Sequence, residues 1–304
     1  MNSVILPSHA TVLITGATGF IGYHLAQQLC QAKYNVHILV RPNSNLNRVK
    51  TLPNIQIHTL PEQTQARIEQ ISHIRPRCIF HLASLFLAEH SPEDIQPLIE
   101  SNILFGTQLL EAAAQTGVPF FINTATAWQH YQQAPYDPTC LYAATKQAFE
   151  DILLYYVNSY SICAASLTLF DTYGPNDPRR KLFSLFRTAE TTPIAMSSGE
   201  QLLDLVYISD VTNAFIQAWQ WLEQEKSALH QKFSISSGQT LTLRQIAELY
   251  SSISGKTLLI DWGKRPYRRC EVMQPWQGGK PLPGWKPQIH LEEGIRRLLT
   301  LTYN

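Results

Sequence analysis

Several features are scarce in this sequence of 304 residues, and each absence excludes a class of protein. The formal net charge is only +1, so no global field would recruit nucleic acid or an anionic membrane. No run of 18 apolar residues occurs, so we expect no membrane-spanning helix. The N-terminal segment MNSVILPSHA lacks the basic region and the long apolar stretch of a signal peptide.

Cysteine and histidine are present without the patterns that would give them a chemical role. The five cysteines are odd in number, widely spaced and form no CxxC pair, which favours reduced thiols and a cytoplasmic location. The ten histidines include no HExxH or similar pair, so we expect no metal site. The chain is long enough for a large core with a smaller lobe beside it.

Strand and helix patterns alternate through the first half of the chain. The predicted strands are 10–15, 35–40, 54–60, 77–83, 119–125 and 161–170. A helix follows the first of them, and further helices are predicted near 62–73, 91–115 and 139–159, the second opening on the serine, proline and acids of SPED. This alternation predicts an α/β fold with a doubly wound parallel sheet of the Rossmann type.

The rhythm changes after residue 170. The segments DTYGPNDPRR and 263–287 are rich in turn-forming and basic residues, and helices return near 209–223, 242–253 and 291–300. We therefore predict two parts. Residues 1–170, with about 205–231, form the larger domain with the Rossmann sheet, and residues 171–204 and 232–304 form a smaller, discontinuous C-terminal lobe.

A glycine-rich turn joins the first strand to its helix. ITGATGFIG places Gly16, Gly19 and Gly22 at the spacing of a dinucleotide fingerprint, between a strand and a helix. Glycine lets the backbone approach a pyrophosphate, and the helix N-terminus supplies free N–H groups. The alternative is a strand–helix turn without a ligand, which this context disfavours.

The end of the second strand bears on the choice of cofactor. An acid there would bind the ribose 2′-hydroxyl of NAD, but no Asp or Glu lies between Tyr34 and Leu60. Instead the strand runs into Arg41, with Ser44 close behind, and an arginine can pair with a 2′-phosphate. We therefore expect NADP(H) to be preferred, with NAD(H) as the alternative if Arg41 is only a solvated charge.

Two residues of the segment LYAATK have the spacing of a catalytic pair. Tyr142 and Lys146 are four residues apart, which puts both on one face of a helix. A free tyrosine titrates at about pH 10, and a neighbouring ammonium lowers that pKa by stabilising the phenolate. The pair is a weak signal alone, and its weight comes from following a glycine fingerprint and a strand-end hydroxyl.

The chain resembles the extended short-chain dehydrogenase/reductase family, in its nucleotide-sugar epimerase, dehydratase and reductase branch. The matching segments are TGATGFIG, HLAS (81–84), NILFGT (102–107), FINTATAW (121–128), YAATK (142–146), TYGP (172–175) and DLVYISDV (204–211). They span nearly the whole chain in the expected order. The resemblance implies a Rossmann fold and transfer of hydride between a nicotinamide and a sugar carbon.

The resemblance also implies roles for individual residues. Tyr142 corresponds to the catalytic acid/base, Lys146 to its electrostatic partner, and Thr124 to the hydroxyl that holds the reacting oxygen; the alternative for Thr124 is a threonine that merely ends a strand. Cofactor contacts are implied for Gly16, Thr18, Gly19, Phe20, Ile21, Gly22, Arg41, Ser44, Leu82, Ala83, Ser84, Asn102, Tyr142, Lys146, Phe170, Thr172 and Tyr173. Asn102 is as well explained by a structural role, and His81 better by a satisfied strand-end position. Trp128 and His130 are expected to shape the substrate cleft, with a core position as the alternative for Trp128.

The reaction type depends on the residues next to Thr124. Sugar 4,6-dehydratases carry Thr-Asp-Glu there, whereas this chain has Thr124, Ala125 and Thr126. Alanine transfers no proton, and threonine is neither an acid nor a base at neutral pH, so elimination of water is disfavoured. A reductase that uses NADPH and a 4-epimerase that keeps NAD remain, and the Arg41 argument favours the reductase.

The substrate is suggested by basic residues of the second lobe. Relatives place an arginine for the diphosphate before the aspartate at 204, where this chain has Leu203. Two arginine-rich loops offer substitutes, and the predicted substrate contacts are Thr124, Thr126, Asp171, Arg179, Lys181 and Arg268. The run around 169–211 most resembles the CDP-abequose and CDP-paratose synthases, which reduce CDP-4-keto-6-deoxyglucose at C4. A nucleotide-diphosphate sugar is therefore the expected substrate, with a non-sugar carbonyl and a cofactor-sensing scaffold as alternatives.

The oligomeric state follows from the helices 91–115 and 139–159. Both carry apolar residues on more than one face. Relatives use this pair for a four-helix contact, so the resemblance implies a homodimer.

Overall fold

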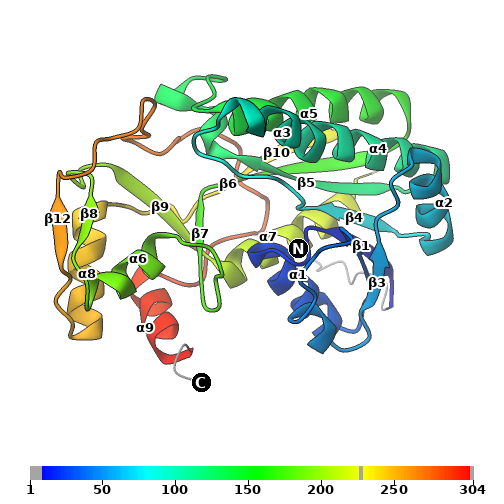
Figure 1. Cartoon of the computed structure of the whole chain (residues 1–304). Helices are drawn as coiled ribbons and strands as arrows, with labels where there is room; N and C mark the ends of the chain where they lie inside the picture. Colours follow the sequence, from blue (N-terminus) through cyan, green and yellow to red (C-terminus); the bar gives the residue numbers. More distant parts are fainter. Residues whose placement is uncertain (1–8, 226–228, 302–304) are drawn as a thin grey trace.

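The computed structural model describes residues 9–225 and 229–301, and its larger part is a seven-stranded sheet (Figure 1). The strand order is β10-β6-β5-β4-β1-β2-β3, and every neighbouring pair is parallel. The strands are β1 (Thr11–Thr15), β2 (Asn35–Val40), β3 (Gln56–Thr59), β4 (Cys78–His81), β5 (Phe120–Thr126), β6 (Cys163–Leu169) and β10 (His230–Ile235). The signal-peptide expectation concerns a segment that lies mostly outside the described residues.

Helices cover both faces of this sheet, as Figure 1 shows. One face packs against α1 (Phe20–Gln31) and α7 (Ile208–Leu222), and the other against α2 (Thr64–Ile74), α4 (Phe105–Thr116) and α5 (Leu141–Ser159). Side chains alternate along each strand, so Val12 and Ile14 enter the first core while Leu13 enters the second. Burial on both faces explains why the strands are continuously apolar.

The smaller lobe has its own strands, helices and core. Its sheets are β11-β9-β7, with β9 parallel to β7 and antiparallel to β11, and the parallel pair β12-β8. Its elements are β7 (Asp171–Tyr173), α6 (Leu182–Ala189), β8 (Ile194–Met196), β9 (Leu202–Tyr207), β11 (Thr240–Thr242), α8 (Leu243–Ser254), β12 (Ile260–Trp262) and α9 (Leu291–Leu301). The predicted fold class, a Rossmann sheet with a smaller C-terminal lobe, is confirmed. In the described ranges no helix is long and apolar enough to cross a membrane.

Two features of the fold differ from the sequence-based prediction. The strand β10 was not predicted, and the expected domain limit between residues 231 and 232 falls inside it. Its first three residues are polar, which it tolerates because it lies at the sheet edge, where His230 and Lys232 bond to neighbouring elements. We propose that the Rossmann domain continues to Ile235.

The predicted helix 91–115 is divided into four pieces. The 3₁₀ turn Pro92–Asp94 leads into α3 (Ile95–Ile99), a π-helical turn at Glu100–Leu104 and then α4. The predicted serine cap is present, with the Ser91 and Asp94 side chains closing a capping box. Such π-helical turns often occur beside functional sites. This one places Asn102, which is buried, next to the loop that follows β4.

Candidate active site

The turn between β1 and α1 is built to approach a ligand closely. Gly16 has φ +74°, and a Cβ there would lie 2.6 Å from the backbone nitrogen of Ala83. A Cβ at Gly22 would collide with the carbonyl oxygen of Gly16. Gly19 is exposed and caps α1 without a side chain, so the first N–H groups of the helix stay accessible. This donor set fits the pyrophosphate of a dinucleotide.

The other residues predicted to contact the cofactor divide into two groups. Because β1, β2 and β4 are parallel neighbours, the segments that follow them meet at one edge of the sheet. Arg41, which is exposed, and Ser44 follow β2 there. They do not line the cavity of about 230 Å³ that contains Thr124 and Tyr142, here called the catalytic cavity. Leu82 and Ser84 follow β4 and do line it, together with Ile21, Phe170 and Thr172.

Asn102 is held by protein groups on every side. Its carbonyl oxygen accepts hydrogen bonds from Ser84 Oγ at 3.0 Å and Leu85 N at 2.7 Å. Its amide donates to Leu85 O at 3.0 Å and to Thr145 Oγ1 at 2.9 Å. Asn102 therefore fixes the loop that carries Ser84 against α5. Asn102 does not line the catalytic cavity itself, but its hydrogen-bond partner Ser84 does.

All eight residues predicted to be catalytic or to bind substrate line one cavity of about 230 Å³: Thr124, Thr126, Tyr142, Lys146, Asp171, Arg179, Lys181 and Arg268. Thr124 and Thr126 come from the end of β5, and Tyr142 and Lys146 come from the buried face of α5. The Thr124 hydroxyl donates to the carbonyl of His81 at 3.0 Å. The Thr126 hydroxyl caps the 3₁₀ turn Ala127–Gln129 by accepting from Trp128 N at 3.3 Å. The sequence segments therefore converge at the carboxyl edge of the sheet.

Burial controls the protonation of the two central groups. It raises the pKa of Tyr142 above the usual range, and hydrogen bonds with Ser84 and Thr126 oppose this rise. Burial also lowers the pKa of Lys146 to about 8, against the attraction of Glu150. Thr126, which the sequence left with a supporting role, is thus the threonine of this pair that bears directly on Tyr142.

His81 lies beneath this group as a neutral, hydrogen-bonded side chain. Its Nδ1 is 2.8 Å from the hydroxyl of Thr15, and it is buried. Burial, together with the charge of Lys146, lowers the pKa of His81 to about 3. The position agrees with the expectation of a satisfied strand-end histidine.

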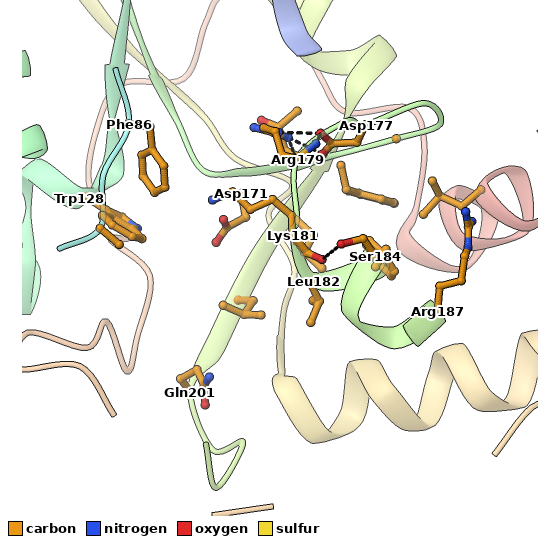
Figure 2. Close-up of a pocket in the computed structure, with 18 of the residues that line it drawn as sticks. Phe86, Trp128, Asp171, Asp177, Arg179, Lys181, Leu182, Ser184, Arg187 and Gln201 are labelled. Carbon is orange, nitrogen blue, oxygen red and sulfur yellow. Dashed lines mark hydrogen bonds and ion pairs between the residues drawn. The ribbon is translucent and has the colours of Figure 1, made fainter. Parts of the chain in front are cut away.

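A second cavity of about 300 Å³ adjoins the first (Figure 2). Phe86 and Trp128 stand on one side of it, and Asp171 and Lys181 lie toward the smaller lobe. The Phe86 ring is 5.3 Å from that of Trp128 and 5.0 Å from that of Tyr142. Phe86 belongs to no motif, so no sequence pattern predicted its position beside the cavity.

The basic residues predicted to bind substrate differ in their partners. Arg179 is paired with both carboxylate oxygens of Asp177, at 2.8 and 2.7 Å, and Arg268 likewise with Glu271, at 3.0 and 2.6 Å. Lys181 has no carboxylate within ion-pair distance in the described part of the chain, and its ammonium lies 4.1 Å above the Phe86 ring. Burial lowers the pKa of Lys181, which Asp171 opposes. Lys181 is therefore the cation of this group with an unmet need for an anion.

Three further predicted residues differ in their relation to the two cavities. Tyr173 is buried in the core of the smaller lobe and borders only the second of the two cavities. Trp128 lines both cavities. His130 does not line them; its ring stacks on Trp276 with centroids 3.7 Å apart.

Comparison with known proteins agrees with this geometry. The model of the NAD dependent epimerase/dehydratase family matches residues 12–232. The CDP-abequose synthase of Salmonella muenchen is 26% identical over 302 residues, which cover 98% of this chain and 99% of that protein. The UDP-glucose 4-epimerase of Mycolicibacterium smegmatis is 26% identical over 317 residues, covering 96% and 98%.

Solved structures show the same fold. The UDP-glucose 4-epimerase of Thermotoga maritima, determined with UDP-glucose, has a TM-score of 0.85 at 23% identity and covers 96% of this chain and 98% of its own. The UDP-glucose 4-epimerase of Thermus thermophilus, in complex with NAD, has a TM-score of 0.81 at 25% identity, covering 95% and 98%. The chain therefore belongs to the NAD dependent epimerase/dehydratase family and is an NAD(P)-dependent enzyme of the extended short-chain dehydrogenase/reductase type.

Proposed function

We propose that this protein is a NADPH-dependent reductase of the keto group of a nucleotide-linked 4-keto-6-deoxy sugar. The observation that carries the proposal is the end of β5, where Thr124 and Thr126 meet Tyr142 with Ala125 between them. No carboxylate stands at these positions to expel a hydroxyl group. The site can therefore exchange a hydride and a proton without eliminating water.

The residues of the chain supply the proton and hold the reacting oxygen. Bound NADPH supplies the hydride that reduces the carbonyl carbon. Tyr142 is kept protonated by its raised pKa, so it can donate its proton to the developing alkoxide. Thr124 polarises the same oxygen once its hydroxyl leaves the His81 carbonyl, and Lys146 stabilises the phenolate left behind.

The cofactor preference rests on the end of β2. Gly16, Gly19 and Gly22 would hold the pyrophosphate, and the exposed Arg41 with Ser44 would pair with a 2′-phosphate. No carboxylate between Tyr34 and Leu60 competes for that position. We therefore propose NADP(H) rather than NAD(H).

The substrate would be held through its diphosphate. Lys181 would take the part of the arginine that is absent at Leu203, because, unlike Arg179 and Arg268, it has no carboxylate partner among the described residues. Phe86 and Trp128 offer aromatic surface to the apolar part of the ligand. The similarity to CDP-abequose synthase supports a nucleotide-linked keto sugar.

A NAD-linked nucleotide-sugar 4-epimerase is the second candidate. The similarity to UDP-glucose 4-epimerases and the NAD complex of the Thermus thermophilus enzyme favour it. Both reactions use Thr124, Tyr142 and Lys146, and they differ in whether cofactor is consumed.

One experiment separates the two. Purified protein is incubated with NADPH and a panel of CDP-, dTDP-, UDP- and GDP-linked 4-keto-6-deoxy sugars, and absorbance of the reduced nicotinamide is followed. A reductase consumes NADPH in proportion to product, with preference over NADH. In the matched Tyr142→Phe variant we expect turnover to fall by about 10²–10⁴-fold. If no keto sugar consumes NADPH and a parallel incubation interconverts UDP-hexoses, the result would favour the epimerase and contradict the proposal.

A further inference from the structure

One buried carboxylate next to the catalytic helix face has no part in the mechanism above. Glu150 is 2% exposed and lies on α5 one turn after Lys146, as Lys146 lies one turn after Tyr142. Residues at this spacing share a helix face. A carboxylate in such a position costs free energy unless charges or hydrogen bonds compensate it.

The partners of Glu150 use only one of its oxygens. Oε2 accepts a hydrogen bond from Gln129 Nε2 at 2.9 Å and forms an ion pair with Lys232 Nζ at 2.9 Å. Oε1 is buried and accepts no hydrogen bond from the described residues. The Lys146 ammonium lies one turn earlier on the same buried face of α5, and the charge of Glu150 attracts it.

The bonds of Glu150 also reach the threonine beside Tyr142. Gln129, which donates to Glu150, accepts the backbone N–H of Thr126 at 3.0 Å. This bond is half of the capping box that shapes the turn after β5. Glu150 is thus linked to the site in two ways. Its charge acts on Lys146, and Gln129 connects it to the backbone of Thr126.

We propose that Glu150 is a positioning residue for the catalytic group, keeping the buried Lys146 ammonium charged and fixing the turn that carries Thr126. The inference rests on the proposed function, in which Lys146 acts beside Tyr142. No nucleophilic or proton-transfer role is assigned to Glu150 itself.

The titratable neighbours leave few charges to compete. Lys146 faces Tyr142 and Glu150 on its own helix and His81 from β4. Glu150 faces Lys232 and His230 from β10, His130 from the segment after β5, and the hydroxyl of Ser166 from β6. Burial lowers the pKa of His81 to about 3 and of His230 to about 4, so both are neutral at working pH. Burial would raise the pKa of Glu150, but its partners, Lys232 foremost, outweigh this and hold it ionised.

The sign of the expected effect follows from this set. Removing the Glu150 charge destabilises the Lys146 ammonium, so its pKa falls further below that of a free lysine. Removing Lys232, the foremost of the partners that hold Glu150 ionised, lets burial raise the pKa of Glu150, so the pKa of Lys146 is expected to fall here too, by less than in Glu150→Gln. Lys232 itself is half exposed.

The test compares Glu150→Gln with Lys232→Gln in the pH profile of kcat with NADPH and the best keto sugar. We expect the alkaline limb to move down by about one pH unit in Glu150→Gln and to move down by less in Lys232→Gln, with Glu150→Asp restoring part of the profile. A merely structural role would lower stability and leave the limbs in place, and profiles that superimpose on the wild type would overturn the proposal. Should Glu150→Gln fail to fold, the downward shift in Lys232→Gln decides alone.

A second readout does not depend on the reaction. The pKa of Lys146 is followed by NMR of lysine labelled with ¹³C at Cε, with Lys146→Met identifying the resonance. A lowered Lys146 pKa in Glu150→Gln supports the inference even if no keto sugar is reduced, in which case the proposed function fails by itself. An unchanged Lys146 pKa overturns the inference whatever the reaction is.

Discussion

At the scale of single residues, the cations of the substrate cleft differ in what already neutralises them. Arg179 and Arg268 each hold a carboxylate through two hydrogen bonds, while Lys181 rests on an aromatic ring. An anionic ligand would have to compete with Asp177 or Glu271 for the arginines but not for the lysine. All three read as free basic residues in the sequence, but in the fold only Lys181 lacks a carboxylate partner among the described residues.

This difference predicts the effect of removing the lysine charge. We expect Lys181→Met to raise KM for the nucleotide-linked sugar by about 10- to 100-fold, because a hydrogen bond to a charged group contributes about 1.5–3 kcal/mol. The change in kcat is expected to be smaller, since Lys181 does not touch Tyr142. Steady-state kinetics with Lys264→Met, an exposed lysine, as the control would check this. An unchanged KM for Lys181→Met would remove it from the diphosphate site.

The sequence was informative about residues whose role depends on local spacing. Tyr142 and Lys146 share a helix face, and the glycines precede a helix, so chain order alone brings them to the site. The carboxylate partners of Arg179 and Arg268 follow from loop conformation, which no periodic pattern encodes. Phe86 reaches Tyr142 only because the loop after β4 folds across the cleft.

At the scale of elements, the turn from β1 to α1 predicts a sharp intolerance of side chains. We expect Gly22→Ala to weaken NADPH binding at least about tenfold, because the new Cβ would collide with the backbone of Gly16 and displace the phosphate turn. Gly117→Ala is the matched control: that glycine has φ +70° and open space around it, so it costs about 1 kcal/mol of stability and leaves binding unchanged. Titration of nicotinamide fluorescence measures both. Equal NADPH affinity in wild type and Gly22→Ala would contradict the assigned turn.

A histidine pair between β2 and β3 predicts a loss of stability in acid. His37 and His58 stack in parallel with 2.8 Å between His37 Nδ1 and His58 Nε2. Burial, followed by the charge of His58, lowers the pKa of His37 to about 4. The folded state thus binds this proton less readily than the unfolded chain, in which histidine titrates at about 6.5. Stability present above that pH is lost as the pH falls from about 6.5 to about 4.

The expected size is about 2 kcal/mol between pH 7 and pH 5 from His37 alone. Urea unfolding at the two pH values measures it, and His37→Gln is expected to reduce the pH dependence by that amount. His290→Gln, at an exposed position, serves as the control and is expected to leave the slope unchanged. If the wild type and His37→Gln lose stability equally, the pair has no such effect.

Elements with strong periodicity were predicted, and those set by tertiary contacts were not. The buried strands and α5 read clearly because both faces of the sheet exclude water. β10 was not predicted because its polar side chains find hydrogen-bond partners only in the folded chain, where Ser166 and Glu150 lie beside it. The π-helical turn in the predicted helix 91–115 has the composition of an ordinary helix, and it is the bonds of Asn102 that mark it.

At the scale of the whole molecule, an exposed apolar surface on two helices supports the proposed homodimer. Leu154 and Tyr155 of α5 are 45% and 57% exposed, and Ile95 and Ile99 of α3 are 46% and 39% exposed. The two helices α3 and α5 are adjacent and lie on one side of the sheet of the Rossmann domain. Apolar surface of this kind is typical of a protein interface.

We expect Leu154→Lys to weaken the dimer by about 30-fold or more, because a buried charge would replace a central apolar contact. Light scattering after size-exclusion chromatography, over a range of concentrations, measures the change. Leu259→Lys, on an exposed leucine outside these helices, is the matched control. A monomeric wild type, or a dimer indifferent to Leu154→Lys, would contradict this interface.

Phe20 has a consequence for how the two ligands bind. It is the first residue of α1, at the phosphate turn, yet its ring is buried in the core of the smaller lobe, with the Arg179 guanidinium 4.6 Å above it. A cofactor bound at the phosphate turn and a substrate bound in the sugar cleft would thus both restrain the Phe20 side chain. Thermodynamic linkage makes such restraint reciprocal, so each ligand would raise the affinity for the other by the same factor. Calorimetric titrations in both orders of addition would reveal that factor, and its absence would show that the two lobes fill independently.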